Sequence, residues 1–163
     1  MCRYANVRMC RFKKLEYFNV FRMILIESIF IKYNFQKRSL PIVIDWQEIE
    51  RIISFRLPKD YKYFLENYHE SEGFVGREYL RLWGYNNLFE NNNGYGITDN
   101  LVCTLGIGSN GGGEFLAIEQ KEPDGCRIVL SPFIGLSKEY HIEIGASFSD
   151  MLNRLDNGHE WFN

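Results

Sequence analysis

The stretch "TLGIGSNGGGEFLAI" at residues 104–118 constrains the fold more than any other part of the sequence. Within it, Gly106, Gly108 and Gly111 spell the G-x-G-x-x-G pattern of a dinucleotide-binding loop. Such a loop leads directly into a helix, whose free N–H groups hold the pyrophosphate. Here "EFLAIE" follows and reads as a strand, and no G-K-[ST] ending supplies the lysine of a P-loop. The glycines therefore predict a turn between two strands, with positive backbone φ angles.

Helices are expected on both sides of this turn. "DWQEIERII" at 45–53 begins with a capping-box pattern, in which Asp45 is the N-cap and Glu48 follows three residues later. "RLPKDYKYFLENY" at 56–68 has Pro58 as a helix opener and apolar side chains at helical spacing. "SFSDMLNRL" at 147–155 repeats the pattern of cap and apolar stripe from Ser147.

Short apolar runs between these helices predict strands at 78–83, 101–107, 114–119 and 126–130. Turn residues separate the last three runs, which is typical of neighbouring antiparallel strands. The Asn-rich stretch "NNLFENNNGYGITDN" at 86–100 is predicted to be a loop or a very short element. The expected fold class is α+β: a mainly antiparallel sheet with N-terminal helices and a C-terminal helix packed on it.

Charge divides the chain into two parts. Residues 1–40 carry nine Lys and Arg against Glu16 and Glu27, a net charge of +7, and because the whole chain has −2, the remainder has −9. We interpret residues 1–44 as a basic accessory extension of unknown structure and residues 45–163 as the domain. Arg22 and Glu27 interrupt the apolar run "FRMILIESIFI", which is too short and too charged to span a bilayer and precedes no cleavage site. The sequence predicts a cytoplasmic protein without membrane contact.

Residues that could carry catalysis or hold a metal are sparse. The four cysteines are scattered without a C-x-x-C pair, and His69, His141 and His159 lie in unrelated contexts. His141 between Glu139 and Glu143 fits a solvated strand edge better than a metal site. We expect no cofactor, no metal and no enzymatic activity. The alternative is a small-ligand or nucleotide-binding enzyme that uses the glycine-rich loop 106–113.

The ordered series of motifs resembles the SMI1/KNR4 family, also called the SUKH superfamily. The series consists of "IE" in the first predicted helix, "LPKDYKYFL", the Asn-rich middle, "IGSNGGGEFLAIE", "PFIGLS" and "SFSDMLNRL", and it covers about residues 45–155. The resemblance implies an α+β domain. It also implies an immunity protein that binds and neutralises a cognate bacterial polymorphic toxin of nuclease or deaminase type.

Aromatic and acidic residues in loops held by a sheet are the candidates for binding such a toxin. They are Trp83, Tyr85, Glu90, Tyr95, Asp99, Ser109, Asn110 and Glu114, while Gly106, Gly108, Gly111, Gly112 and Gly113 are assigned a structural role in the turn. Trp83 fits the core better than an interface. The acidic body favours a basic toxin as partner, and no nucleic acid. We expect the free protein to be a monomer.

Overall fold

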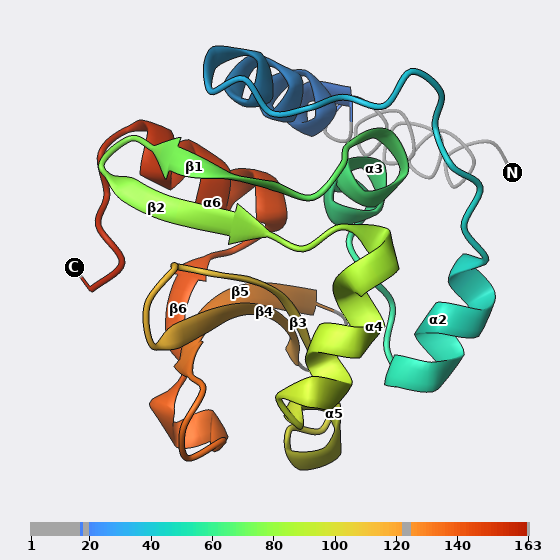
Figure 1. Cartoon of the computed structure of the whole chain (residues 1–163), viewed down its shortest axis with the longest axis vertical. Coiled ribbons are helices and arrows are strands. Elements are labelled where there is room, and N and C mark those ends of the chain that lie inside the picture. Colours follow the sequence, from blue (N-terminus) through green and yellow to red (C-terminus); the bar gives the residue numbers. More distant parts are fainter. Residues whose placement is uncertain (1–16, 18–19, 122–124, 163) are drawn as a thin grey trace, which may run out of the picture.

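The computed structural model describes residues 17, 20–121 and 125–162 of the 163-residue chain (Figure 1). Within these residues, six strands form a single sheet whose spatial order is the order of the sequence, with every strand antiparallel to the next. The strands are β1 (Ser71–Val75), β2 (Glu78–Leu82), β3 (Thr104–Ser109), β4 (Glu114–Lys121), β5 (Gly125–Pro132) and β6 (Ile142–Gly145). The sheet is curled, and helices pack around it. The predicted α+β class is confirmed.

Two helices begin at the side-chain caps that the sequence predicts. In α2 (Trp46–Ile53), the Asp45 side chain accepts a hydrogen bond from the Glu48 N–H, and in α6 (Phe148–Asp156), the Ser147 side chain accepts one from the Asp150 N–H. The predicted helix after Pro58 is α3 (Lys59–Asn67). Each cap satisfies an N–H group that the first turn leaves without a partner.

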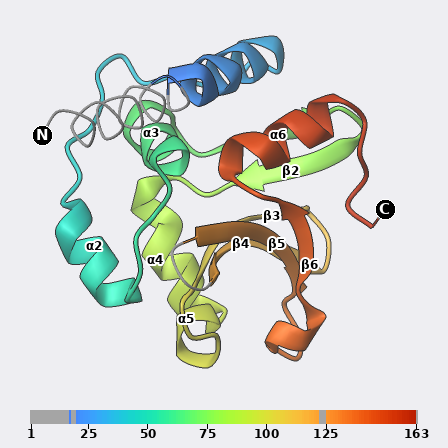
Figure 2. The ribbon, with the colours of Figure 1, turned by 180° about the vertical axis from the view of Figure 1, so that it is seen from behind.

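A buried carboxylate joins α3 to α6. Asp60 is 2% exposed, and its Oδ2 accepts hydrogen bonds of 2.9 Å from both the N–H and the hydroxyl of Ser149. Beside this contact, the Phe148 ring meets Tyr61 edge-on at 5.3 Å and lies 5.5 Å from Phe64. The two helices therefore form one layer over the sheet, as Figure 2 shows from behind.

The prediction of a loop in the Asn-rich stretch is wrong. Residues in it form α4 (Tyr85–Gly94) and α5 (Ile97–Asn100), although asparagine is a poor helix former. Leu88 and Asn92 lie four residues apart on the buried side of α4, and both are fully buried. Tertiary packing therefore overrides the local preference. Strand β1 and the short helix η1 (Lys138–Tyr140) also lie outside the sequence predictions.

A helix at 20–32 packs on the domain from the segment interpreted as an accessory extension. Ile26, Ile29 and Phe30 are at most 2% exposed and belong to the same hydrophobic core as the sheet. At the end of this helix, Lys32 and Tyr33 both donate hydrogen bonds to Asp156 of α6. The described part of the extension therefore shares the core. The boundary at 44/45 as a limit of independent folding stays a prediction.

Candidate partner-binding cleft

An open cleft of about 540 Å³ lies where β1 and β2 meet the β3–β4 turn and α4. We call it the aromatic cleft. Its lining residues are Glu72, Phe74, Tyr79, Arg81, Trp83, Asn91, Tyr95, Ser109, Asn110, Gly111, Gly112 and Phe133. Four of the predicted binding residues are among them: Trp83, Tyr95, Ser109 and Asn110.

The paired part of β2 and β3 beside the cleft is short. These strands share only the pairs Arg81↔Ser109 and Leu82↔Gly108, whereas β1 and β2 pair along five residues. Strand β3 ends at Ser109, and the glycine turn that follows lies against the Tyr79 ring at Gly111. Figure 1 shows β1 and β2 standing apart from β3 to β5. Register partners from three strands, Phe74 with Tyr79 and Arg81 with both Glu72 and Ser109, line the cleft on one face of the sheet.

Stacked aromatic rings form one wall of the cleft. Tyr95 stacks on Trp83 at 6.1 Å between centroids with an interplanar angle of 10°, and lies 4.3 Å from Phe133. Phe133 in turn contacts the fully buried Phe115 at 5.3 Å. Trp83 is 3% exposed and belongs to the core, whereas Tyr95 is 51% exposed. The Tyr95 ring is therefore presented to solvent on a rigid support.

The opposite wall carries a second aromatic pair and the only cationic group lining the cleft. Phe74 is 62% exposed and meets Tyr79 edge-on at 5.6 Å. Arg81 donates to Glu70 at 2.6 Å and lies 3.6 Å from Glu72. The hydrogen bond to Glu70 raises the pKa of Arg81 above its usual value, so the guanidinium stays charged. Its position is fixed by its acidic partners.

Asn110 and Glu114 brace the glycine turn. The Asn110 side chain donates to Glu114 Oε2 at 2.7 Å and accepts from the Gly112 N–H at 2.9 Å. Gly111 has φ +76°, and a Cβ atom there would lie 2.6 Å from the Tyr79 ring. A glycine is therefore required at 111 for two reasons, backbone conformation and space.

The prediction of positive φ angles throughout the turn is wrong for the other glycines of the motif. Gly106 and Gly108 lie inside β3, and neither they nor Gly112 and Gly113 have a positive φ. At Gly106 a Cβ atom would lie 2.7 Å from Ile97 and 2.9 Å from Trp83, and at Gly108 it would lie 2.1 Å from a backbone oxygen of Arg81. These two glycines allow close packing.

The backbone of Gly106 is already hydrogen-bonded. Asn92 of α4 accepts from the Gly106 N–H and donates to the Gly106 carbonyl, both at 2.8 Å. The next element is strand β4, as the sequence predicts, so the loop does not lead into a helix. The geometry by which a dinucleotide fingerprint holds phosphate is absent from residues 104–121.

The structure brings together half of the candidate binding residues. Trp83, Tyr95, Ser109 and Asn110 line the aromatic cleft, and Glu114 adjoins it through Asn110. Tyr85, Glu90 and Asp99 do not line it; Glu90 and Asp99 are exposed on α4 and α5. Which of these residues contact a partner stays a prediction.

Sequence reasoning missed Phe74, Tyr79, Arg81 and Phe133. A signal for the first three exists in "EGFVGREYLRL" at 72–82, where two alternating runs flank Gly76 and Arg77. Gly76 has φ +63° and begins a two-residue hairpin turn, a conformation that favours glycine. Phe133 has no comparable local signal, because only the β4–β5 pairing carries it to Tyr95.

A second polar cluster lies around Glu119, away from the cleft. Glu119 is 5% exposed and contacts Arg127 at 2.8 Å, Lys138 at 3.2 Å and His141 Nδ1 at 3.2 Å. Burial by itself would raise the pKa of Glu119, but hydrogen bonds from these three partners outweigh it and lower the pKa. The ion pair between Lys138 and Glu119 links η1 to β4. Within the described residues, no group of three or more His, Cys, Asp or Glu could hold a metal ion.

Comparison with known proteins agrees with this architecture. The model of the SMI1 / KNR4 family (SUKH-1) matches residues 44–154, more than half of the chain. The match confirms the resemblance seen in the motif series over 45–155. No curated protein matches the sequence. In the part of the chain that the structure describes, no helix is long and apolar enough to cross a membrane.

Proposed function

The chain belongs to the SMI1 / KNR4 family (SUKH-1), and we propose that it is a non-enzymatic immunity protein that binds and neutralises a cognate bacterial toxin through the aromatic cleft. The observation that carries the proposal is the Tyr95 ring, half-exposed and held between Trp83 and Phe133. A rigid aromatic side chain loses little conformational entropy on binding, and such residues dominate the energy of protein interfaces.

The chemistry of the cleft supports recognition more than catalysis. The ionised groups that line it are Arg81 and Glu72, and Arg81 is paired with Glu70 at 2.6 Å as well as with Glu72 at 3.6 Å. The remaining polar groups are amides and hydroxyls, such as those of Asn91, Ser109 and Tyr79. These groups donate and accept hydrogen bonds without a proton to transfer near neutral pH. The cleft therefore suits a polar and aromatic protein surface.

Charge supports a basic toxin of nuclease or deaminase type. The chain outside residues 1–40 has a net charge of −9, and Glu72, Glu90 and Asp99 are exposed in or near the elements that form the cleft. Complementary fields steer association and raise its rate. In this proposal the protein acts in the cytoplasm, as a monomer until it meets the toxin.

The experiment has two stages. A pull-down with the full chain from its native host, followed by mass spectrometry, identifies the toxin. Binding is then measured by calorimetry for Tyr95→Ala and for Tyr140→Ala, a matched control that is 53% exposed on η1. We expect Tyr95→Ala to weaken binding by about 2 kcal/mol, roughly 30-fold in Kd, and to abolish protection of cells that express the toxin. Tyr140→Ala should stay within about threefold.

The two stages separate two errors. Recovery of partners that include no toxin would contradict the immunity function itself. A toxin that binds Tyr95→Ala as tightly as the native chain would leave that function standing and remove the aromatic cleft as its interface.

A further inference from the structure

The helix at 20–32 has a second apolar face that points away from the core. We call it the outer stripe. Its members, with their exposed fractions, are Tyr17 (80%), Val20 (55%), Phe21 (64%), Ile24 (61%) and Ile31 (72%). Their spacings of three, one, three and seven residues place them on one side of an α-helix at about 100° per residue. Exposed Ser28 separates Ile31 from the other four, which gather within two turns. Single exposed apolar residues are ordinary, but such a cluster marks a surface that binds something.

The helix cannot turn over to hide this stripe. On its opposite side, Phe30 is fully buried and contacts Phe35 at 4.7 Å, Tyr68 at 4.6 Å and Phe64 at 5.6 Å. An ion pair holds the helix as well, because Lys32 binds Asp156 of α6. The inner face is thus fixed to the domain, and the outer stripe stays exposed.

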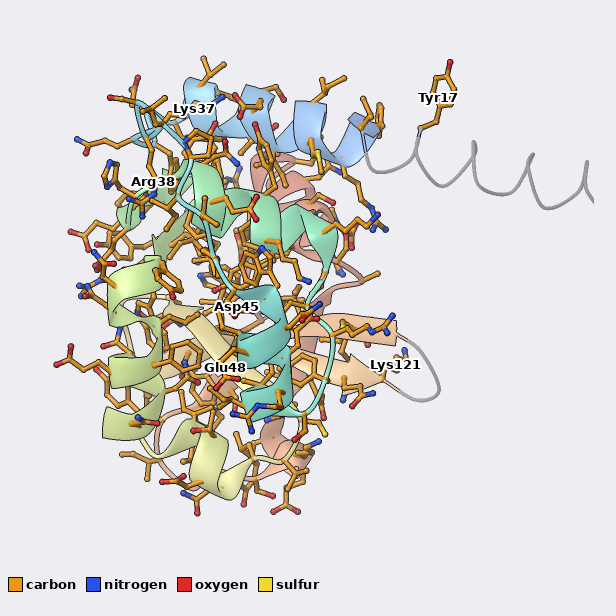
Figure 3. The ribbon with its side chains drawn as sticks, turned by 90° about the vertical axis from the view of Figure 1, so that its right-hand side faces the viewer. Tyr17, Lys37, Arg38, Asp45, Glu48 and Lys121 are labelled. Carbon is orange, nitrogen blue, oxygen red and sulfur yellow. The ribbon has the colours of Figure 1, made fainter. Side chains whose placement is uncertain are left out.

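The segment that contains this helix is basic in sequence. Figure 3 shows Tyr17 standing away from the body at one end of the helix, with Lys37 and Arg38 beyond the other end. Lys32 is paired with Asp156, and Lys37 with Glu27 of the helix itself. In the sequence, five further Lys and Arg residues precede Tyr17 within residues 1–14. The segment 1–40 thus has a net charge of +7, opposite in sign to the remainder.

We propose that the outer stripe lies in the headgroup region of a membrane rich in anionic phospholipid. An exposed apolar helix face with aromatic residues, in a segment rich in Lys and Arg, can lie in the plane of a bilayer. A second copy of the chain fits less well, because a two-fold axis through the stripe would bring two segments of net charge +7 together. The acidic body would face away from the lipid.

This inference departs from the sequence-based expectation of no membrane contact. The sequence "FRMILIESIFI" does not reveal which apolar residues the core uses, and the expectation concerned spanning and secretion. A helix that lies along the surface needs no span, so the inference agrees with the finding that no described helix could cross a membrane. It is independent of the immunity function, because the stripe and the aromatic cleft belong to different elements.

Flotation of the full chain with lipid vesicles tests the proposal. Vesicles that mix phosphatidylcholine with phosphatidylserine should bind the native chain about tenfold or more tightly than phosphatidylcholine alone, and added salt should weaken binding. The variant Phe21→Ser/Ile24→Ser should bind mixed vesicles at least about tenfold less. The matched control Phe162→Ser/Ile134→Ser changes the same residue types at positions 63% and 89% exposed, and should stay within about twofold.

The native chain provides a readout that no folding defect can imitate, because the lipid and salt dependence need no variant. The proposal is overturned if the native chain floats with neither kind of vesicle, or binds both equally at every salt concentration. It is equally overturned if the stripe variant binds like the native chain. A native dimer in analytical ultracentrifugation that the stripe variant converts to a monomer, without vesicle binding, would assign the stripe to a second copy.

Discussion

Replacing Phe30 with alanine tests whether the helix at 20–32 is part of the hydrophobic core. The Phe30 side chain is fully buried and contacts three other rings, of Phe35, Phe64 and Tyr68. A Phe→Ala substitution at such a position leaves a cavity and costs about 3–5 kcal/mol. We therefore expect the free energy of unfolding to fall by about 4 kcal/mol and Tm by roughly 8–16 °C for a chain of this length.

The control is Phe21→Ala, which makes the same chemical change on the exposed side of the same helix, where the ring is 64% exposed. It should alter the free energy of unfolding by less than about 1 kcal/mol. Urea unfolding followed by circular dichroism gives both values. Equal urea midpoints for the two variants would refute the reasoning, since they would mean that the helix stabilises the domain no more on its inner side than on its outer side.

The same assay addresses the domain boundary. The sequence alone predicts that a chain beginning at Ser39 folds cooperatively, whereas the structure shows that this truncation uncovers Phe64 and Tyr68. We expect the truncated chain to lose more stability than Phe30→Ala. A cooperative transition at a lower urea midpoint would keep the boundary at 44/45, and the loss of any transition would place the helix inside the folding unit.

Two further predictions concern the glycine turn and the cluster around Glu119. Gly111→Ala should lower the free energy of unfolding by about 1–3 kcal/mol, because φ is +76° and the new methyl group meets Tyr79. The control Gly113→Ala, with nothing within 4 Å of the new methyl group, should lower it by less than about 1 kcal/mol. Equal losses of stability in urea unfolding would contradict the assigned geometry. Glu119→Gln should cost about 1–3 kcal/mol at neutral pH, because three cationic or hydrogen-bonding partners lose a carboxylate. The folded pKa of Glu119 is lowered, so its contribution is present above the unfolded pKa of about 4.3 and lost as pH falls through the folded pKa. The difference between native and variant stability should therefore shrink in acid, and a difference that is constant from pH 7 to about pH 3 would show that the carboxylate is not the cause.

The sequence by itself determined the elements whose signals are local. The Asp45 and Ser147 caps act over three residues, and the apolar stripe after Pro58 repeats within one helix. The strand after the glycines was likewise evident, because an apolar run of strand length follows them at once. Each of these patterns depends on neighbours within a turn or two of backbone, which the sequence displays directly.

Tertiary structure alone decided the Asn-rich helix and the aromatic cleft. Asn92 holds α4 by binding the backbone of Gly106, fourteen residues away, and that contact outweighs the poor helix propensity of its neighbours. The cleft joins Tyr79 to Gly111 because the register of β2 with β3 places the glycine turn beside β2. The helix at 20–32 is the clearest case, since its sequence is apolar on two sides. Packing against α3 buries Phe30 and leaves Phe21 exposed, because one helix can turn only one face to a core.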